Sequence, residues 1–122
     1  MQKLITKEQK MQMLRNGRIT LIESAEPDDD KFTDHWPVVK LFTPDGGATW
    51  LLSEIRPDDH DIAFGLCDLG LGFPELGYVS LSEIASVRGA LGLPVERDIH
   101  FKATKSLSEY CHDAYEAGRI IA

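Results

Sequence analysis

The fold of this chain is decided by residues 38–55, which read VVKLFTPDGGATWLLSEI. Two mainly apolar runs, Val38–Thr43 and Ala48–Ile55, flank the tetrapeptide Pro44-Asp45-Gly46-Gly47. Proline presets φ for a turn and glycine supplies left-handed positions, so the pattern predicts two strands joined by a hairpin. Connections of this length make the sheet mainly antiparallel, because parallel neighbours need a long crossover.

Further strand-like segments lie on both sides of this hairpin. Ile19–Ile22 is a short β-branched run that precedes it. Ile62–Cys67 alternates larger with smaller apolar side chains and follows a polar turn, Arg56–Asp61. Tyr78–Ser80 leads into a helix, and Val95–Phe101 alternates apolar or long side chains with polar ones. Alternation with a period of two is typical of strands with one buried face.

The first helix is marked by its capping residues. Thr6 followed three residues later by Gln9 reads as a capping box. Gly17 reads as the residue that ends the helix, because glycine adopts the left-handed conformation of a helix C-terminus. The sequence therefore predicts a helix over about 7–16.

The tetrapeptide Ser-Leu-Ser-Glu occurs twice, at 80–83 and 106–109, and each copy reads as a capping box. The helices that follow are predicted to end at Gly89 and Gly118. The last helix carries an apolar stripe with helical spacing: Leu107, Tyr110, Cys111, Ala114 and Tyr115. Such a stripe packs against a sheet.

These elements predict an α+β domain. Their order is an N-terminal helix, a strand meander, a helix, a strand and a C-terminal helix. We expect a mainly antiparallel sheet of about five strands, with the three helices packed on one face. The 122 residues fit a single domain, 1–122. The polar stretch 23–34, with Pro27 and three consecutive aspartates, is predicted to be a flexible acidic loop.

Charge is distributed unevenly along the chain. The net charge is −7, and residues 57–87 contain six acids and no Lys or Arg. A nucleic-acid binder needs a basic stripe to neutralise phosphates, so direct nucleic-acid binding is not expected. The alternative depends on basic residues of the N-terminal segment: Lys3, Lys7, Lys10, Arg15 and Arg18.

Apolar runs are short throughout the sequence. None approaches the ~20 residues needed to span a bilayer, and the N-terminus lacks the apolar core of a signal peptide. We therefore expect a cytoplasmic protein without a membrane partner. In that compartment Cys67 and Cys111 are predicted to be free thiols.

The segment 68–77, DLGLGFPELG, is rich in glycine. Its glycine spacing, its acidic flank and the lack of a following Lys do not fit a phosphate-binding loop. The favoured interpretation is a strand-to-strand connection whose glycines permit bulges or positive φ, while Leu71, Phe73 and Leu76 fill the core. The alternative is a loop that presents Phe73 and Leu76 to a partner.

Acidic residues are the second feature with chemical potential. The run Asp58-Asp59-His60-Asp61 is typical of a turn in which aspartates cap backbone groups. Alternatively, carboxylates spread along the chain could converge at one end of the sheet and hold a divalent cation: Glu54, Asp61, Asp68 and Glu75. No metal site or cofactor is predicted, because no Cys or His pattern has ligand spacing.

Catalytic residues are not predicted. Cys111 and His112 are neighbours, but adjacent positions of a helix point in different directions. Trp36 and Trp50 are expected to anchor the core, although an exposed Trp36 at a sheet edge would be an interface anchor.

Three motifs resemble a bacterial domain family of unknown function. They are residues 36–54 (WPVVKLFTPDGGATWLLSE), 64–77 (FGLCDLGLGFPELG) and 92–98 (GLPVERD), and the first helix matches as well. Members of that family are found on plasmids, integrative elements and phage-like regions. The resemblance implies an accessory protein of a mobile element and supplies no catalytic residues.

Together these observations favour a non-enzymatic protein that binds a host or element-encoded protein. Its acidic surface would inhibit a DNA-handling or defence complex by competing for a basic groove. The candidate contact residues are Trp36, Asp58, Asp59, Asp61, Asp68, Phe73 and Glu75. The alternative is a small metal-dependent hydrolase or nuclease that uses the carboxylates of residues 54–75. The oligomeric state is not predicted.

Overall fold

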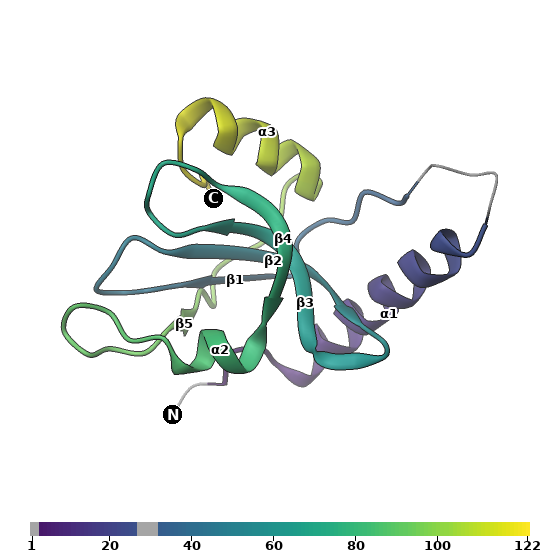
Figure 1. Cartoon of the computed structure of the whole chain (residues 1–122), viewed down its shortest axis with the longest axis horizontal. Helices are drawn as coiled ribbons and strands as arrows, with labels where there is room; N and C mark the ends of the chain where they lie inside the picture. Colours follow the sequence, from purple (N-terminus) through teal and green to yellow (C-terminus); the bar gives the residue numbers. More distant parts are fainter. Residues whose placement is uncertain (1–2, 27–31) are drawn as a thin grey trace.

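The computed structural model describes residues 3–26 and 32–122, and this part of the chain forms three helices and five strands (Figure 1). In chain order they are α1 (Lys7–Ser24), β1 (Val39–Phe42), β2 (Thr49–Arg56), β3 (Asp59–Asp68), β4 (Glu75–Ser80), α2 (Leu81–Ser86), β5 (Glu96–Arg97) and α3 (Leu107–Ala117). This order confirms the predicted α+β class. Residues 27–31 of the expected acidic loop lie outside the described residues.

The strands form one antiparallel sheet with the order β4-β3-β2-β1-β5. The predicted hairpin is confirmed, and its turn is closed by the bond from Thr43 N to Ala48 O (3.0 Å). β3 begins at Asp59, so the second turn is shorter than the predicted Arg56–Asp61. These hairpins give β2 and β3 a partner on each side and leave β4 at an edge of the sheet.

The last predicted strand, Val95–Phe101, is mostly wrong, because β5 contains only Glu96 and Arg97. Asp98 ends it: its backbone N–H still bonds to Lys40 O, but its side chain accepts from His100 N and its carbonyl from Phe101 N. An aspartate that binds the backbone two residues ahead forms a turn, so the chain leaves the sheet here.

α1 corrects two predictions. The helix does not end at Gly17 but continues to Ser24, and Ile19–Ile22 is helical. Gly17 has no left-handed backbone; a Cβ built on it would lie 1.9 Å from the Ile55 carbonyl oxygen. Glycine is therefore needed here for the close approach of helix and strand, and a helix-ending glycine looks the same in sequence.

α2 and α3 begin as predicted. Ser80 and Ser106 are their N-caps, and Ser106 forms a full capping box with Glu109. Gly118 ends α3 in the left-handed conformation (φ 76°), but α2 ends at Ser86 rather than at Gly89. The chain turns back after α2 because residues 87–95 form a short hairpin-like loop, whose Leu91 and Leu93 N–H groups bond to Asp45.

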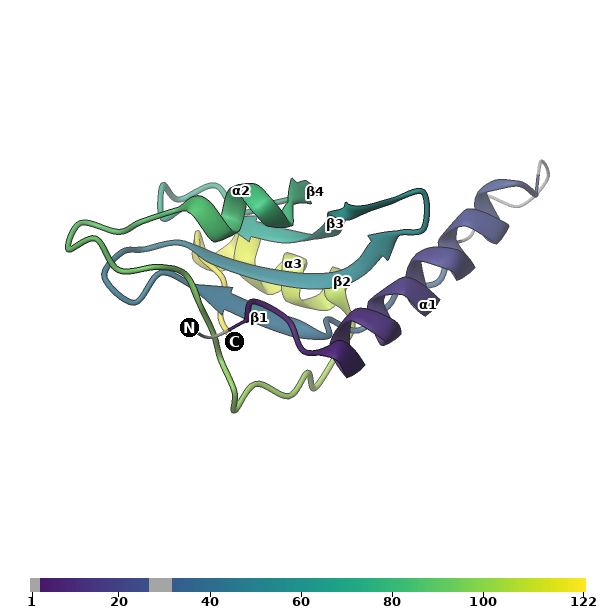
Figure 2. The same cartoon turned by 90° about the horizontal axis from the view of Figure 1, so that it is seen from below.

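The helices cover both faces of the sheet, which corrects the prediction that they share one face (Figure 2). Met13 of α1 and Ile84 of α2 pack in a core that includes Trp50 and Leu52. α3 packs on the opposite face, against a core that includes Leu51 and Leu66. The unbroken apolar run at 50–52 buries β2 on both sides, as in sheets that carry helices on each face.

A β-bulge at Ser53 changes which face β2 presents. Leu52 pairs with Gly65 and Glu54 with Phe64, so Ser53 is the extra residue. Asn16 of α1 donates to the carbonyl of Ser53 at 2.9 Å. Because of the bulge, Ile55 joins Leu52 in the core beneath α1, and Glu54 is turned to the α3 side.

The predicted free thiols are confirmed, since neither Cys67 nor Cys111 forms a disulfide. Among the helices of residues 3–26 and 32–122, none has the length and hydropathy required to cross a membrane.

Candidate functional site

The acidic residues of the second turn are engaged locally. Asp58 forms a two-point ion pair with Arg56, at 3.1 and 2.9 Å. Asp59 accepts from the backbone N–H of Asp61. Asp61 accepts from the hydroxyl groups of Ser80 and Ser82 and from the Ser82 N–H, and these bonds lower its pKa. Asp61 therefore ties β3 to the start of α2.

Asp68 and Glu75 lie at the other end of β3. Asp68 is buried and accepts from the N–H groups of Gly70 (2.8 Å) and Ile120 (3.0 Å). Glu75 is exposed opposite Cys67, and burial together with this carboxylate raises the pKa of that thiol to about 11. Asp68 thus closes a loop and holds the C-terminal segment, which is a structural task.

The structure does not bring these carboxylates together. Asp61 and Asp68 are seven residues apart on β3, a separation of about 23 Å at ~3.3 Å per residue. The described residues contain no group of three or more His, Cys, Asp or Glu side chains that could hold a metal ion. The hydrolase alternative needs such a group around one site.

The glycine-rich loop differs most from its favoured interpretation. Leu71, Phe73 and Leu76 do not fill the core; 73, 79 and 40% of their surfaces are exposed. Gly70 and Gly72 have positive φ, and a Cβ on Gly72 would have no neighbour within 4 Å. The loop therefore extends into solvent, beyond the last pair of β3 and β4.

The two tryptophans differ. Trp50 is buried in the core beneath α1, as predicted. Trp36 precedes β1 and is more than half exposed, so the prediction that it anchors the core is wrong.

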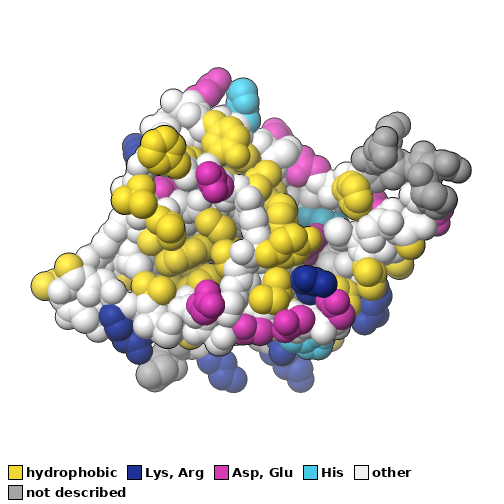
Figure 3. Space-filling model, viewed as in Figure 1, with side chains coloured by type: hydrophobic (Ala, Val, Ile, Leu, Met, Phe, Trp, Pro, Cys, Tyr) yellow, Lys and Arg dark blue, Asp and Glu magenta, His cyan; other side chains and the backbone are white. Residues whose placement is uncertain are grey.

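Exposed apolar side chains gather along β4. We define the β4 surface as the loop and strand residues Leu71, Phe73, Leu76 and Tyr78 together with Tyr115 of α3. Tyr115 lines a hollow of about 270 Å³ with Phe73 and Glu75 and interacts with the Leu76 backbone. Figure 3 shows hydrophobic side chains spread over this side of the molecule.

A second feature lies next to the β4 surface. A cavity of about 280 Å³, called here the Glu54 pocket, opens between α1, the sheet and the start of α3. Most of the surface that lines it is apolar. The lining residues are Thr20, Phe32, Thr33, Asp34, His35, Ser53, Glu54, Phe64, Leu76, Tyr78, Leu107 and Ser108.

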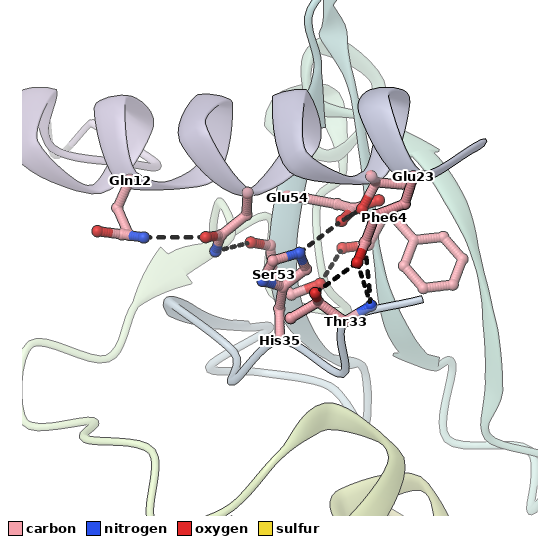
Figure 4. A network of polar contacts seen from close by, with 9 residues as sticks. Gln12, Glu23, Thr33, His35, Ser53, Glu54 and Phe64 are labelled. Atoms are coloured by element: carbon pink, nitrogen blue, oxygen red, sulfur yellow. Dashed lines mark hydrogen bonds and ion pairs between the residues drawn. The ribbon is translucent and has the colours of Figure 1, made fainter. Parts of the chain in front are cut away.

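Glu54 and His35 are the central polar groups of this pocket, and they point toward one another (Figure 4). Their side chains are only 10% and 9% exposed. Thr20 donates to Oε2 of Glu54 at 2.7 Å. Nε2 of His35 lies 3.8 Å from the same oxygen, too far for a hydrogen bond, and has no other partner among the described residues.

The segment that carries His35 is held at several points. Glu23 of α1 accepts from the N–H and hydroxyl of Thr33, which lowers the Glu23 pKa. The carbonyl of His35 accepts from Leu107 N at 2.9 Å. Burial would raise the pKa of Asp34, but bonds from Ser108 and Ser106 outweigh it and lower this pKa. His35 is therefore fixed in place between α1 and α3.

Sequence reasoning did not pair His35 with Glu54. One signal was available in the sequence. The predicted hairpin turn at 44–47 places residues before β1 beside the end of β2, and the observed pairing of Val39 with Leu52 agrees with this. The bulge at Ser53 and the passage of α1 across β2 left no local pattern, and both are needed to form the pocket.

Residues 4–121 match the model of the family described as Protein of unknown function (DUF2958), and the chain belongs to that family. No curated protein and no solved structure matches the chain.

Proposed function

We propose that this protein works by binding another protein through the β4 surface, without catalysing a reaction. The observation that carries the proposal is the coincidence of exposed apolar side chains with a sheet edge. Contiguous apolar surface of this kind marks interaction sites in soluble proteins. Phe73 and Tyr78 are the expected anchors, because aromatic side chains dominate binding energies at interfaces.

The edge itself favours a partner that adds an extended segment. β4 is an outer strand, and its outer side has no strand partner in the described residues. It carries no Lys and no Pro, the residues that usually protect an edge, and a Cβ on Gly77 would meet nothing within 4 Å. An extended peptide could bond to this backbone and place its side chains on Leu76 and Tyr78.

Charge narrows the chemistry of the partner. Glu75 lines a hollow with Phe73 and Tyr115 of the β4 surface, and Asp58, Asp59 and Glu83 are exposed within the stretch 57–87, which has no Lys or Arg. A partner segment with basic residues beside apolar ones complements this surface. The proposed partner is a protein of the host or of a mobile element. In its most specific form, the proposal is that binding inhibits a DNA-handling or defence complex of the element's host.

The test compares two substitutions of equally exposed apolar residues. Phe73→Lys alters the β4 surface, and Leu91→Lys is the matched control in the 87–95 loop, where Leu91 is 80% exposed. Affinity capture from host lysate with wild type should retain a defined protein, which Leu91→Lys keeps and Phe73→Lys loses. Equal retention by both variants, or equal loss, contradicts the β4 surface as the interface.

The identity of the retained protein tests the specific form. Recovery of a nuclease, a helicase or an interference complex supports inhibition of a DNA-handling or defence system. Recovery of an unrelated protein that depends on Phe73 keeps the binding proposal and removes the inhibitory one. Washing at high salt should weaken retention in part, since the charged contribution is screened and the apolar contribution is not.

A further inference from the structure

The Glu54 pocket combines buried acceptors with a negatively charged surrounding. Glu54 is at its centre, and Asp34 and Glu23 hold its rim. No Lys or Arg lines it within the described part of the chain. Arg56, which lies over the ring of Tyr78 outside this lining, is paired with Asp58. A buried carboxylate is normally paired, so the pocket is complementary to a positive charge.

Its geometry fits an ammonium nitrogen. Oε2 of Glu54 and Nε2 of His35 are 3.8 Å apart, so one nitrogen can lie about 2.9 Å from both. With the imidazole proton on Nδ1, Nε2 is an acceptor, and an ammonium group has three donors. The same nitrogen would satisfy the imidazole atom that has no partner in the described residues.

The walls suit the alkyl part of such a ligand. Phe64 and Tyr78 form an edge-to-face pair with ring centroids 5.1 Å apart, and Leu76, Leu107 and Phe32 complete the apolar lining. Aromatic faces attract organic cations in addition to their apolar contacts. At about 280 Å³ the cavity is at the small end of ligand sites, which selects a short chain.

We infer that the Glu54 pocket binds a primary alkylammonium group, with Glu54 and His35 as acceptors of its protons. The group can come from a free amine or from a lysine side chain of a bound protein. The pocket shares Leu76 and Tyr78 with the β4 surface, so a partner on β4 could place a lysine here. Only this second source depends on the proposed function.

The inference is tested on the isolated full chain by NMR titration with n-butylammonium chloride. Saturable shifts are expected for His35, Phe64 and Tyr78, while 1-butanol and butyrate, which match the alkyl chain, cause none at the same concentrations. Equal shifts with 1-butanol would identify a merely apolar cavity and overturn the inference.

Variants separate the acceptor from the fold. Glu54→Gln should weaken butylammonium binding at least about tenfold, the loss expected for one charge-assisted hydrogen bond. Glu75→Gln, the matched control on the exposed surface, should bind as wild type does. Tyr78→Leu keeps an apolar wall without an aromatic face and should weaken binding severalfold. Wild-type affinity in Glu54→Gln would overturn the assignment.

The two sources are distinguished by a second probe. N-acetyl-lysine methylamide presents the same ammonium group on a peptide-like body. Tighter binding of this probe than of butylammonium assigns the pocket to a protein side chain, and the reverse assigns it to a free amine. Neither titration uses the captured partner. A negative titration therefore leaves the Phe73→Lys comparison intact, and a negative capture experiment leaves the inference about the pocket intact.

Discussion

Glu54 and Asp68 are both buried carboxylates of the same sheet, but they are satisfied in different ways. Asp68 accepts from two backbone N–H groups, those of Gly70 and Ile120. Within the described residues, Glu54 accepts from one hydroxyl group, that of Thr20, and faces a cavity in which the nearest basic atom, His35 Nε2, is 3.8 Å away.

This difference separates a carboxylate that stabilises the fold from one that can still accept a further hydrogen bond. Backbone donors are fixed by the fold, so a carboxylate that they satisfy is part of the fold and has little left to offer a ligand. A carboxylate that is held by one side-chain hydroxyl and borders a hollow keeps an acceptor available. Burial alone therefore does not distinguish Glu54 from Asp68; the number and kind of their donors do.

The largest effect is expected from the residue that places α1 on the sheet. In Gly17→Ala the new Cβ would lie 1.9 Å from the Ile55 carbonyl oxygen, and this backbone atom cannot move away cheaply. We expect a loss of about 3 kcal/mol in the free energy of unfolding, at the upper end for overpacking. Urea denaturation measures it.

The same variant should affect Glu54 but not Asp68. A shifted α1 moves Thr20 away from Glu54, whereas the donors of Asp68, the N–H groups of Gly70 and Ile120, lie outside α1. Gly77→Ala is the control, because its Cβ meets nothing within 4 Å, and it should change stability by less than about 0.5 kcal/mol. Similar stability of the two variants would contradict this account of Gly17.

Asp68→Asn tests the structural carboxylate. The amide has one acceptor oxygen, and its NH₂ group would face an N–H donor, so one of the two backbone bonds is lost without replacement. We expect a loss of about 2 kcal/mol in unfolding free energy. Asp59→Asn, an exposed acid at the opposite end of β3, should be almost neutral, and equal losses would show that the two N–H bonds contribute nothing.

Features of local origin were predictable from sequence. The hairpin at 43–48 and the caps Ser80 and Ser106 depend on residues a few positions apart, and the structure confirms them. Features that depend on distant contacts were not. Gly17 has the same identity whether it ends a helix or lets a strand approach, and only the position of Ile55 decides between the two.

The candidate site was less predictable for the same reason. Strict alternation from Trp50 and Leu52 would put Glu54 on their face, and the bulge at Ser53 reverses this. An apolar residue also looks the same in sequence whether it is buried or exposed, which is why the prediction that Phe73 and Leu76 fill the core is wrong. Of the acids at 58–61, Asp58 lies in the turn, whereas Asp59 and Asp61 belong to β3; both of these accept from backbone N–H groups, as predicted.

Glu54→Gln tests the carboxylate that faces the cavity. The amide oxygen can still accept from Thr20, and a neutral group is easier to bury than a charge, so the unfolding free energy should change by less than about 1 kcal/mol. The urea midpoint of this variant should therefore lie closer to wild type than that of Asp68→Asn. A loss as large as that of Asp68→Asn would make Glu54 a structural residue.

The smallest effect concerns Asp34, at the rim of the Glu54 pocket. Hydrogen bonds from Ser108 and Ser106 lower its pKa in the folded protein despite partial burial. A lowered folded pKa stabilises the protein above the ordinary value of 3.8, and this contribution is lost as pH falls through the folded pKa.

Asp34→Asn removes that titration. Its stability should decrease less steeply than that of wild type below about pH 4, while both remain nearly parallel above pH 5. Thermal unfolding across this range measures the two slopes.

Asp113→Asn is the control. Lys105 lowers the Asp113 pKa, so this variant should also reduce the loss of stability at acidic pH, but Asp113 lies away from the pocket. If butylammonium binding changes in Asp34→Asn and not in Asp113→Asn, the rim carboxylate contributes to the pocket through its charge. If the stabilities of wild type and Asp34→Asn fall in parallel below pH 4, the Ser108 bonds do not stabilise the carboxylate of Asp34.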